Sequence, residues 1–141
     1  MNWITFAILA ATSFGFYNFF TKLAADKLSP TIALMFIAGT SFIIAMVATL
    51  MFKISGQPLS FSKNAILFPI LAGAFTGIAE IFYLFMFTKN APLSIGNPLV
   101  VGGTIIVAVI LGLIILREPL STVKIAGILV TLTGLVILTR G

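Results

Sequence analysis

The feature that most constrains this chain is the spacing of its charged residues, nearly all of which lie at the edges of five long apolar stretches. Each stretch is close to the roughly 20 apolar residues that a helix needs to cross a membrane. With 60% hydrophobic and 8% charged residues, the chain has too few charges to cover a soluble domain. The sequence therefore predicts an all-α integral membrane protein of five transmembrane helices, over residues 3–23, 31–52, 65–88, 94–116 and 122–139.

The connections between these stretches are short, so sequential helices should be neighbours within a single five-helix membrane domain over residues 1–141. Ser29 and Pro30 form the pattern of an N-cap followed by proline at the first helical position. Ser94 is expected to cap the fourth helix, which would place Pro98 in its first turn. The proline after Glu118 is expected to end that helix. The N-terminus lacks the positive region and cleavage site of a signal peptide, so we expect a retained helix.

Composition excludes several functional classes. The chain has no cysteine and no histidine, which removes disulfides, thiolate zinc sites and imidazole metal ligands. Its acids are Asp26, Glu80 and Glu118, too few for most hydrolytic sites. It contains no Walker loop, dinucleotide fingerprint or zincin helix. We therefore expect neither an enzyme nor an ATP-driven pump, and no metal or cofactor. The basic residues are scattered singly beside the spans, which predicts lipid rather than nucleic acid as the partner.

The basic residues are evenly divided between the two membrane faces. Each face carries four Lys or Arg residues. Those on the face of the N-terminus are Lys53, Lys63, Arg117 and Lys124, and those on the opposite face are Lys22, Lys27, Lys89 and Arg140. Orientation normally follows an excess of Lys and Arg on the cytoplasmic side, and here none exists. Either other features fix one orientation, or the chain inserts in both. Two opposite copies would form an antiparallel homodimer, each being one half of a ten-helix inverted-repeat assembly.

Glu80 is the most informative residue, because it lies about 22 Å into the third stretch at 1.5 Å per residue. An acid at that depth costs about 2.5–3.5 kcal/mol on insertion scales and normally faces a cavity or a partner. Thr76 and Tyr83 share its helical face. Two interpretations stay open: a carboxyl group that couples protons or contacts substrate, and a structural acid bonded to another helix.

Other polar residues within the spans are candidates for the same site. Tyr17 and Asn18 of the first stretch are the best candidates for partners of Glu80, although no spacing rule links them. Asn97 of the fourth stretch shares a face with Thr104. Single Ser and Thr residues in membrane helices mostly bond their own backbone, so they carry little weight.

Glycines indicate where helices approach one another. Residues 73–77 hold a GxxxG pattern, and further glycines mark the fourth and fifth stretches. Small residues allow the close backbone approach on which helix association in lipid depends. We expect helix packing and much of the protomer contact at Gly103, Gly112, Gly127 and Gly134.

The last third of the chain resembles the second part of an EamA-like domain of the drug/metabolite transporter superfamily. The matching segments are a turn before a glycine-rich helix, an acid and leucine after it, and a fifth helix with two spaced glycines, at residues 91–94, 116–121, 124–127 and 133–136. The turn at 22–30 is also similar. The resemblance implies a five-helix transporter domain, with Glu118 matching the acid at the end of the helix, which we interpret as a structural cap or loop anchor.

The chain departs from that family's pattern in two respects. Many members have a proline midway along the fourth helix, where this chain has residues 102–104 without one, and most members fuse two such domains. The related small multidrug-resistance proteins carry their functional acid in the first helix, which here has none, so an analogue would have to be Glu80.

These observations favour a secondary transporter of the inner (cytoplasmic) membrane. We expect an exporter of small metabolites or of hydrophobic or cationic compounds, working as an antiparallel homodimer with alternating access. The alternative is a non-transporting membrane subunit or scaffold that pairs with another small membrane protein.

Overall fold

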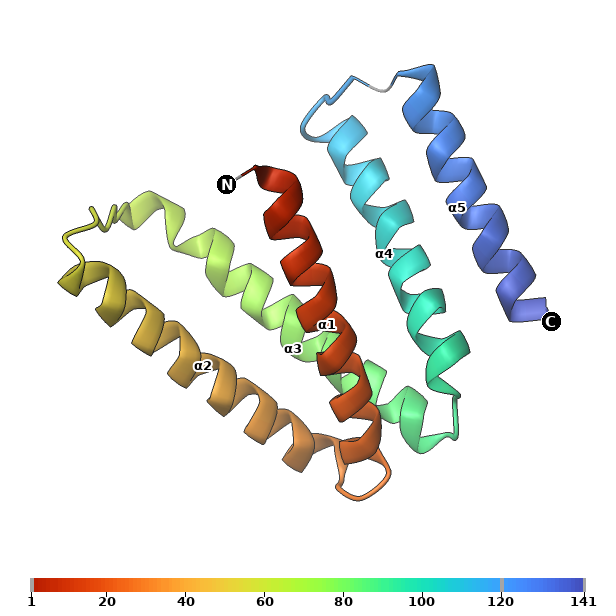
Figure 1. Cartoon of the computed structure of the whole chain (residues 1–141), viewed down its shortest axis with the longest axis horizontal. Coiled ribbons are helices and arrows are strands. Elements are labelled where there is room, and N and C mark those ends of the chain that lie inside the picture. Colours follow the sequence, from red (N-terminus) through yellow and green to blue (C-terminus); the bar gives the residue numbers. More distant parts are fainter. Residues whose placement is uncertain (1, 120, 141) are drawn as a thin grey trace. The chain divides into compact units, whose positions relative to one another are not determined.

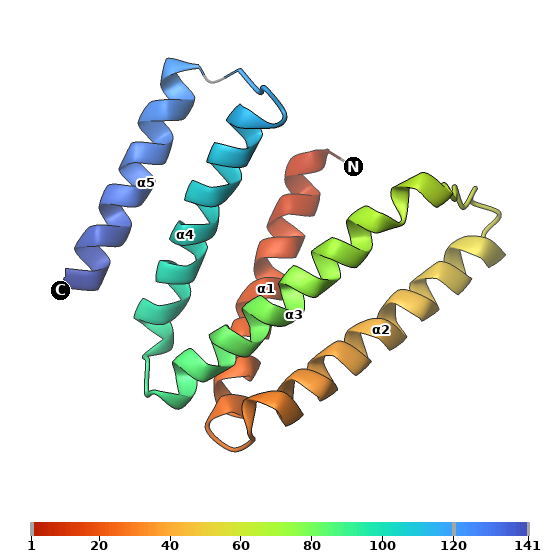
Figure 2. The same ribbon diagram turned by 180° about the vertical axis from the view of Figure 1, so that it is seen from behind.

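The computed structural model describes residues 2–119 and 121–140 and contains five long helices joined by short connections (Figures 1 and 2). All five are long and apolar enough to cross a membrane, and the described residues form no strand. The predicted fold class is confirmed, and each helix end lies within two residues of its expected position. The helices are α1 (Trp3–Ala25), α2 (Pro30–Ile54), α3 (Leu67–Thr88, preceded by a 3-10 turn at Lys63–Ala65), α4 (Leu93–Ile114) and α5 (Thr122–Arg140).

The helix starts follow backbone chemistry, with one correction. Ser29 is the N-cap residue of α2 and Pro30 is its first helical residue, as expected. The prediction that Ser94 caps α4 is wrong, because Pro92 holds the extended N-cap conformation and its carbonyl accepts the Gly96 N–H at 2.8 Å. Pro98 therefore lies inside the helix rather than in its first turn. Its missing N–H leaves the carbonyl of Ser94 without the usual helical bond.

The end of α4 is set by a backbone turn rather than by Pro119. The helix stops at Ile114, and Arg117 adopts the left-handed conformation with φ 54°. The backbone N–H of Glu118 then donates to the carbonyl of Gly112 at 3.0 Å. The backbone of Glu118 thus anchors the loop against the end of the helix.

The chain forms two compact units, residues 1–89 and 90–141, which we describe separately. In the first unit, α1, α2 and α3 all contact one another. Its buried residues gather where the C-terminal ends of α1 and α3 meet the N-terminal end of α2, and they are Thr21, Ala25, Ala33, Tyr83, Leu84 and Phe87. From this closed end, α1 and α2 diverge (Figures 1 and 2).

The second unit is an antiparallel pair formed by α4 and α5. Gly102 is buried in α4 and faces Leu135 of α5. A Cβ atom at Gly102 would collide with the Leu135 side chain, whose Cγ atom would lie 3.2 Å away. The glycine therefore permits the two helices to pack at this point.

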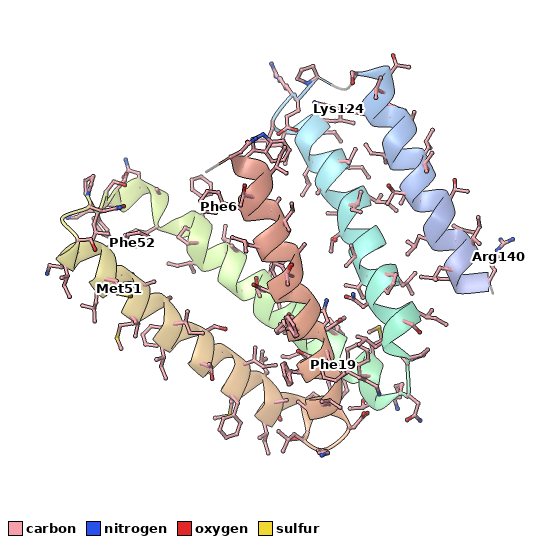
Figure 3. All side chains as sticks on the ribbon, viewed as in Figure 1. Phe6, Phe19, Met51, Phe52, Lys124 and Arg140 are labelled. Atoms are coloured by element: carbon pink, nitrogen blue, oxygen red, sulfur yellow. The ribbon has the colours of Figure 1, made fainter. Side chains whose placement is uncertain are left out.

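Large apolar side chains cover the outside of the helices rather than their contacts. Phe6, Phe19, Met51 and Phe52 are 49–64% exposed and project outward along the first unit (Figure 3). In water such a surface would be unstable, whereas the hydrocarbon core of a membrane covers it. The exposure pattern is therefore that of membrane-spanning helices.

Candidate functional site

Glu80 lies in the interior of α3, about 20 Å along the helix from Leu67 at 1.5 Å per residue. Its side chain is half-buried. Since α3 is one of the five spans, the carboxyl group lies at a depth where acids are rare and mark functional sites.

Tyr17 of α1 is the partner of Glu80. Its hydroxyl group donates a hydrogen bond to Oε2 of Glu80, and both side chains are partly buried. The expectation that the Tyr17–Asn18 pair supplies this partner is confirmed for Tyr17. Asn18 is half-buried beside it, and the bond to Glu80 comes from Tyr17. A bond between helices satisfies a polar group that lipid cannot.

The contact belongs to a longer seam between α1 and α3. On α1, Thr21 follows Tyr17 by one helical turn and is 2% exposed. On α3, Tyr83 and Phe87 follow Glu80, both buried, with ring centroids 4.8 Å apart in an edge-to-face arrangement. Residues three or four apart share a helix face. Tyr17 and Thr21 therefore lie on one face of α1, and Glu80, Tyr83 and Phe87 lie on one face of α3, with Tyr17 opposite Glu80.

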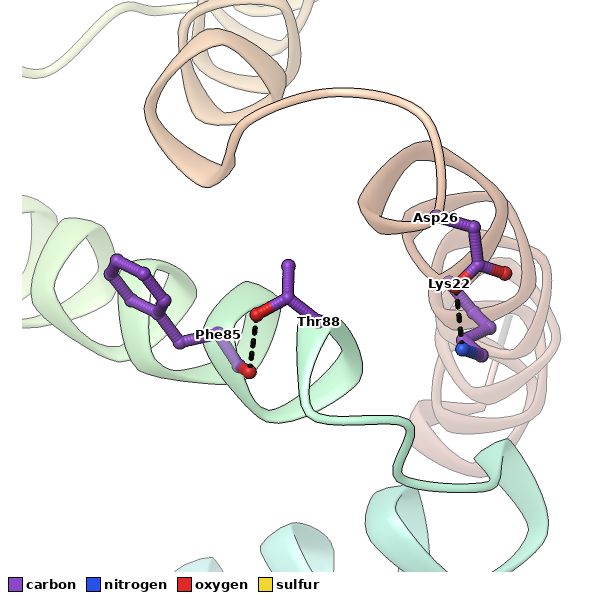
Figure 4. Close-up of polar contacts among 4 residues, drawn as sticks. All are labelled: Lys22, Asp26, Phe85 and Thr88. Atoms are coloured by element: carbon purple, nitrogen blue, oxygen red, sulfur yellow. Dashed lines mark hydrogen bonds and ion pairs between the residues drawn. The ribbon is translucent and has the colours of Figure 1, made fainter.

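Charged groups lie at the closed end of the first unit (Figure 4). The Lys22 amine is 2.7 Å from Oδ1 of Asp26 and 5.5 Å from the ring centroid of Phe87. Nearby on α3, the Thr88 hydroxyl donates to the carbonyl of Phe85 at 2.8 Å. The ion pair and the Thr88 bond each lie within one helix end, and the contact of Lys22 with Phe87 joins α1 to α3. An exposed ion pair contributes at most about 1 kcal/mol, so Lys22 and Asp26 stabilise the end of α1 weakly.

A groove of about 580 Å³ lies between α1 and α2. The described residues that line it include no Asp, Glu, Lys or Arg. Its polar lining consists of hydroxyl groups, and the rest is apolar. The hydroxyl-bearing residues are Ser13, Tyr17, Thr21, Thr40 and Ser41. Tyr17 thus belongs both to the groove and to the contact with Glu80.

The other predicted site residues are neither donor nor acceptor of this bond. The Thr76 hydroxyl donates to the carbonyl of Ala72 in its own helix at 2.8 Å and is exposed. Tyr83 lies one turn beyond Glu80 on α3 and is buried. Asn97 is half-buried on α4, in the second unit. Thr21, which the sequence analysis did not select, is buried on α1 between Tyr17 and the closed end. Thr21 follows Tyr17 by four residues, and this spacing could have indicated that the two share a helix face.

The glycines assigned to packing separate into two groups. A Cβ atom at Gly103, Gly127 or Gly134 would have no neighbour within 4 Å among the described residues beyond its own stretch of helix. A Cβ atom at Gly112 would lie 3.4 Å from Oε2 of Glu118. The glycine at which α4 packs against α5 is instead Gly102. The sequence places Gly102 and Gly103 side by side, and it does not indicate which of the two faces α5.

Five apolar helices with an acid–phenol bond inside the spans define a multi-pass membrane protein with a polar intramembrane site. The chain belongs to the EamA-like transporter family, whose sequence profile matches residues 1–140. The resemblance seen in the sequence is thereby confirmed. Comparisons with curated proteins and with solved structures found no match. The chain is therefore a membrane protein of the drug/metabolite transporter type.

Proposed function

We propose that the protein is a secondary transporter that exports small metabolites or hydrophobic or cationic compounds, with Glu80 as its coupling carboxyl group. The observation that carries this proposal is the hydrogen bond between Tyr17 and Glu80 within the spans. An acid kept at this depth against its insertion cost is the usual mark of a proton or substrate site.

The arrangement gives Glu80 a chemical role. A carboxylate accepts hydrogen bonds, and on protonation it gains a donor and loses its charge. Because its partner Tyr17 also lines the α1–α2 groove, a change at Glu80 alters the polar wall that a solute meets. Proton binding and solute binding are then linked, and each shifts the equilibrium of the other by the same factor.

We further propose that two copies work as an antiparallel homodimer in the inner (cytoplasmic) membrane. The balance of four basic residues on each face supports this arrangement. The first unit is closed at one end, where Thr21 and Phe87 are buried, and α1 and α2 diverge toward the other. Opposite copies would present their closed ends to opposite sides of the membrane, which suits alternating access by rocking.

Reconstitution into liposomes tests the transport proposal. With an imposed pH gradient and a pH-sensitive dye inside, wild-type protein should show a proton flux that depends on added solute. Glu80→Gln removes the ionisable group with little change in shape, so this solute-dependent flux should disappear. Glu118→Gln is the matched control, because Glu118 anchors a loop at the end of α4, and it should behave as wild type.

Two outcomes contradict the proposal. Wild-type flux in Glu80→Gln would show that Glu80 does not couple transport. Absence of solute movement by wild-type protein across a broad panel of amines, amino acids and sugars would favour the non-transporting subunit.

A further inference from the structure

We propose that the α1–α2 groove binds a small amphipathic amine bearing N–H groups, which donates to the phenol oxygen of Tyr17. This inference names the ligand class of the transporter proposed above and rests on that function for its identification as cargo. It follows from the direction of the hydrogen bonds around the groove, its charge and its size.

The hydroxyl groups with described bonds in the groove have already used their hydrogens. The Ser13 hydroxyl donates to the carbonyl of Leu9 at 2.9 Å, and the Tyr17 hydroxyl donates to Glu80. A hydroxyl group has one hydrogen and two lone pairs, so the Ser13 oxygen is left to act as an acceptor. The Tyr17 oxygen also accepts from the Thr21 hydroxyl and keeps one lone pair for a ligand. A ligand that matches them must bring hydrogen-bond donors.

Charge selects an amine among the possible donors. Glu80 lies directly behind Tyr17, and two hydrogen bonds of about 2.8 Å in series would bring a ligand nitrogen within roughly 5–6 Å of the carboxyl group. A positive charge at that separation is attracted when Glu80 is ionised, and the attraction exceeds that in bulk water. Lys22, the cation of α1, is held by Asp26 and leaves this attraction largely uncancelled.

The remaining lining sets the size and character of the ligand. Phe20, Phe36, Ile37 and Ile44 supply apolar surface in a groove of about 580 Å³. That volume lies within the range of roughly 300–1,000 Å³ typical of small-molecule sites. An aromatic or branched alkyl group fits this wall, with the ammonium group directed toward Tyr17.

Binding of 1-naphthylmethylamine and its N,N,N-trimethyl derivative separates donor recognition from general attraction of cations. Affinity is measured by titration calorimetry on the full chain in lipid nanodiscs. Wild-type protein should bind the primary amine more tightly, because the trimethyl compound has no N–H. Tyr17→Phe removes the acceptor oxygen and should weaken primary-amine binding by about tenfold or more, as expected for a hydrogen bond to a charged group. The trimethyl compound should bind both proteins alike.

A steric variant tests the location independently of Tyr17. Thr40→Phe fills the groove and should abolish amine binding. Thr49→Phe is its control, because Thr49 is an exposed residue of the same helix outside the groove lining. Should Tyr17→Phe fail to fold, this pair still decides the matter.

The inference is overturned if Tyr17→Phe binds the primary amine as wild type does, if the trimethyl compound binds wild-type protein equally well, or if Thr40→Phe retains binding. Glu80-dependent transport without amine binding in the groove refutes this inference and leaves the transporter proposal standing. Amine binding that depends on Tyr17, in a protein without solute-dependent proton flux, supports this inference and refutes the transporter proposal.

Discussion

The described cross-helix hydrogen bond of Glu80 is the one from Tyr17. Its magnitude indicates that stability alone does not account for an acid within the span. Insertion of an acid at the helix centre costs about 2.5–3.5 kcal/mol. An interhelical hydrogen bond in a membrane returns about 0.6–2 kcal/mol. The Tyr17 bond therefore offsets part of the cost, and an apolar residue at position 80 would give a more stable protein. An acid retained at such a position is typical of a functional site.

The depth of Glu80 could be predicted from the sequence because it depends on counting residues at a fixed rise per residue. The partner of Glu80 was harder to predict, since no local sequence rule relates positions in two different helices. Tyr17 is one of few polar residues in the first span and was predicted as the partner, whereas the sequence analysis did not single out Thr21. What singles out Thr21 is its burial, which depends on tertiary packing.

At the residue scale we predict opposite effects for two adjacent glycines. Gly102→Ala should destabilise the protein by about 1–3 kcal/mol, because its Cβ atom would meet the Leu135 side chain. Gly103→Ala should be neutral or slightly stabilising, since alanine favours helix by roughly 1 kcal/mol and no described atom lies within 4 Å of its Cβ position beyond its own stretch of helix. Thermal unfolding in detergent compares the two variants.

Shortening the opposing side chain provides the control. Leu135→Ala added to Gly102→Ala should remove the collision, so that the alanine at 102 costs less than it does in the wild-type background. Equal unfolding temperatures for the two single variants would show that α4 and α5 do not pack through Gly102.

At the scale of elements, the spans were predictable because apolar length and flanking charge determine them before any packing does. The ends of α4 were less predictable from the sequence. Its start shifted to Leu93 because Pro92 rather than Ser94 takes the N-cap conformation, and it ended early because Arg117 adopts a left-handed turn. Positive φ at an arginine has no local sequence signal, since that conformation is favoured by Gly and Asn.

The element-scale prediction concerns α4 and α5 as the surface between protomers. Gly127→Leu and Gly134→Leu should convert the proposed dimer into monomer in detergent, because each adds a bulky side chain where close backbone approach is expected. Neither should disturb the fold of one chain, since no described atom lies within 4 Å of either Cβ position outside the local helix. Size-exclusion chromatography with light scattering reports the change.

Gly39→Leu is the matched control on α2, because its Cβ position is equally unobstructed in the single chain. It should remain dimeric. Retention of the dimer in both α5 variants would place the protomer contact elsewhere.

At the scale of the whole molecule, the account depends on equal numbers of basic residues at the two membrane faces. The helix bounds place Lys53 at the last turn of α2 and Lys22 at the last turn of α1, on opposite sides of the membrane. Each Lys or Arg near a cytoplasmic loop biases orientation, and four on each face cancel. This balance was visible in the sequence, whereas its consequence for assembly is a proposal.

Disturbing this balance should disturb activity. Two lysines appended to the C-terminus make the count six against four, which should favour the orientation with the C-terminus in the cytoplasm. Antiparallel pairs then become scarce, and transport in cells should fall. Two glutamines appended at the same place are the control and should leave transport unchanged; equal activity of the two extended proteins would contradict the prediction.

Cysteine labelling tests the central claim, that the working protein is a pair of oppositely oriented copies, most directly. The chain has no cysteine of its own, so Ser29→Cys and Ser60→Cys, made separately, place one thiol in the first or the second loop without changing any charge. A membrane-impermeant maleimide is applied to intact cells and again after permeabilisation. The account predicts that about half of each variant reacts before permeabilisation and the remainder afterwards. Complete labelling of one variant from outside, with no labelling of the other until the cells are opened, would mean a single orientation and would contradict the account.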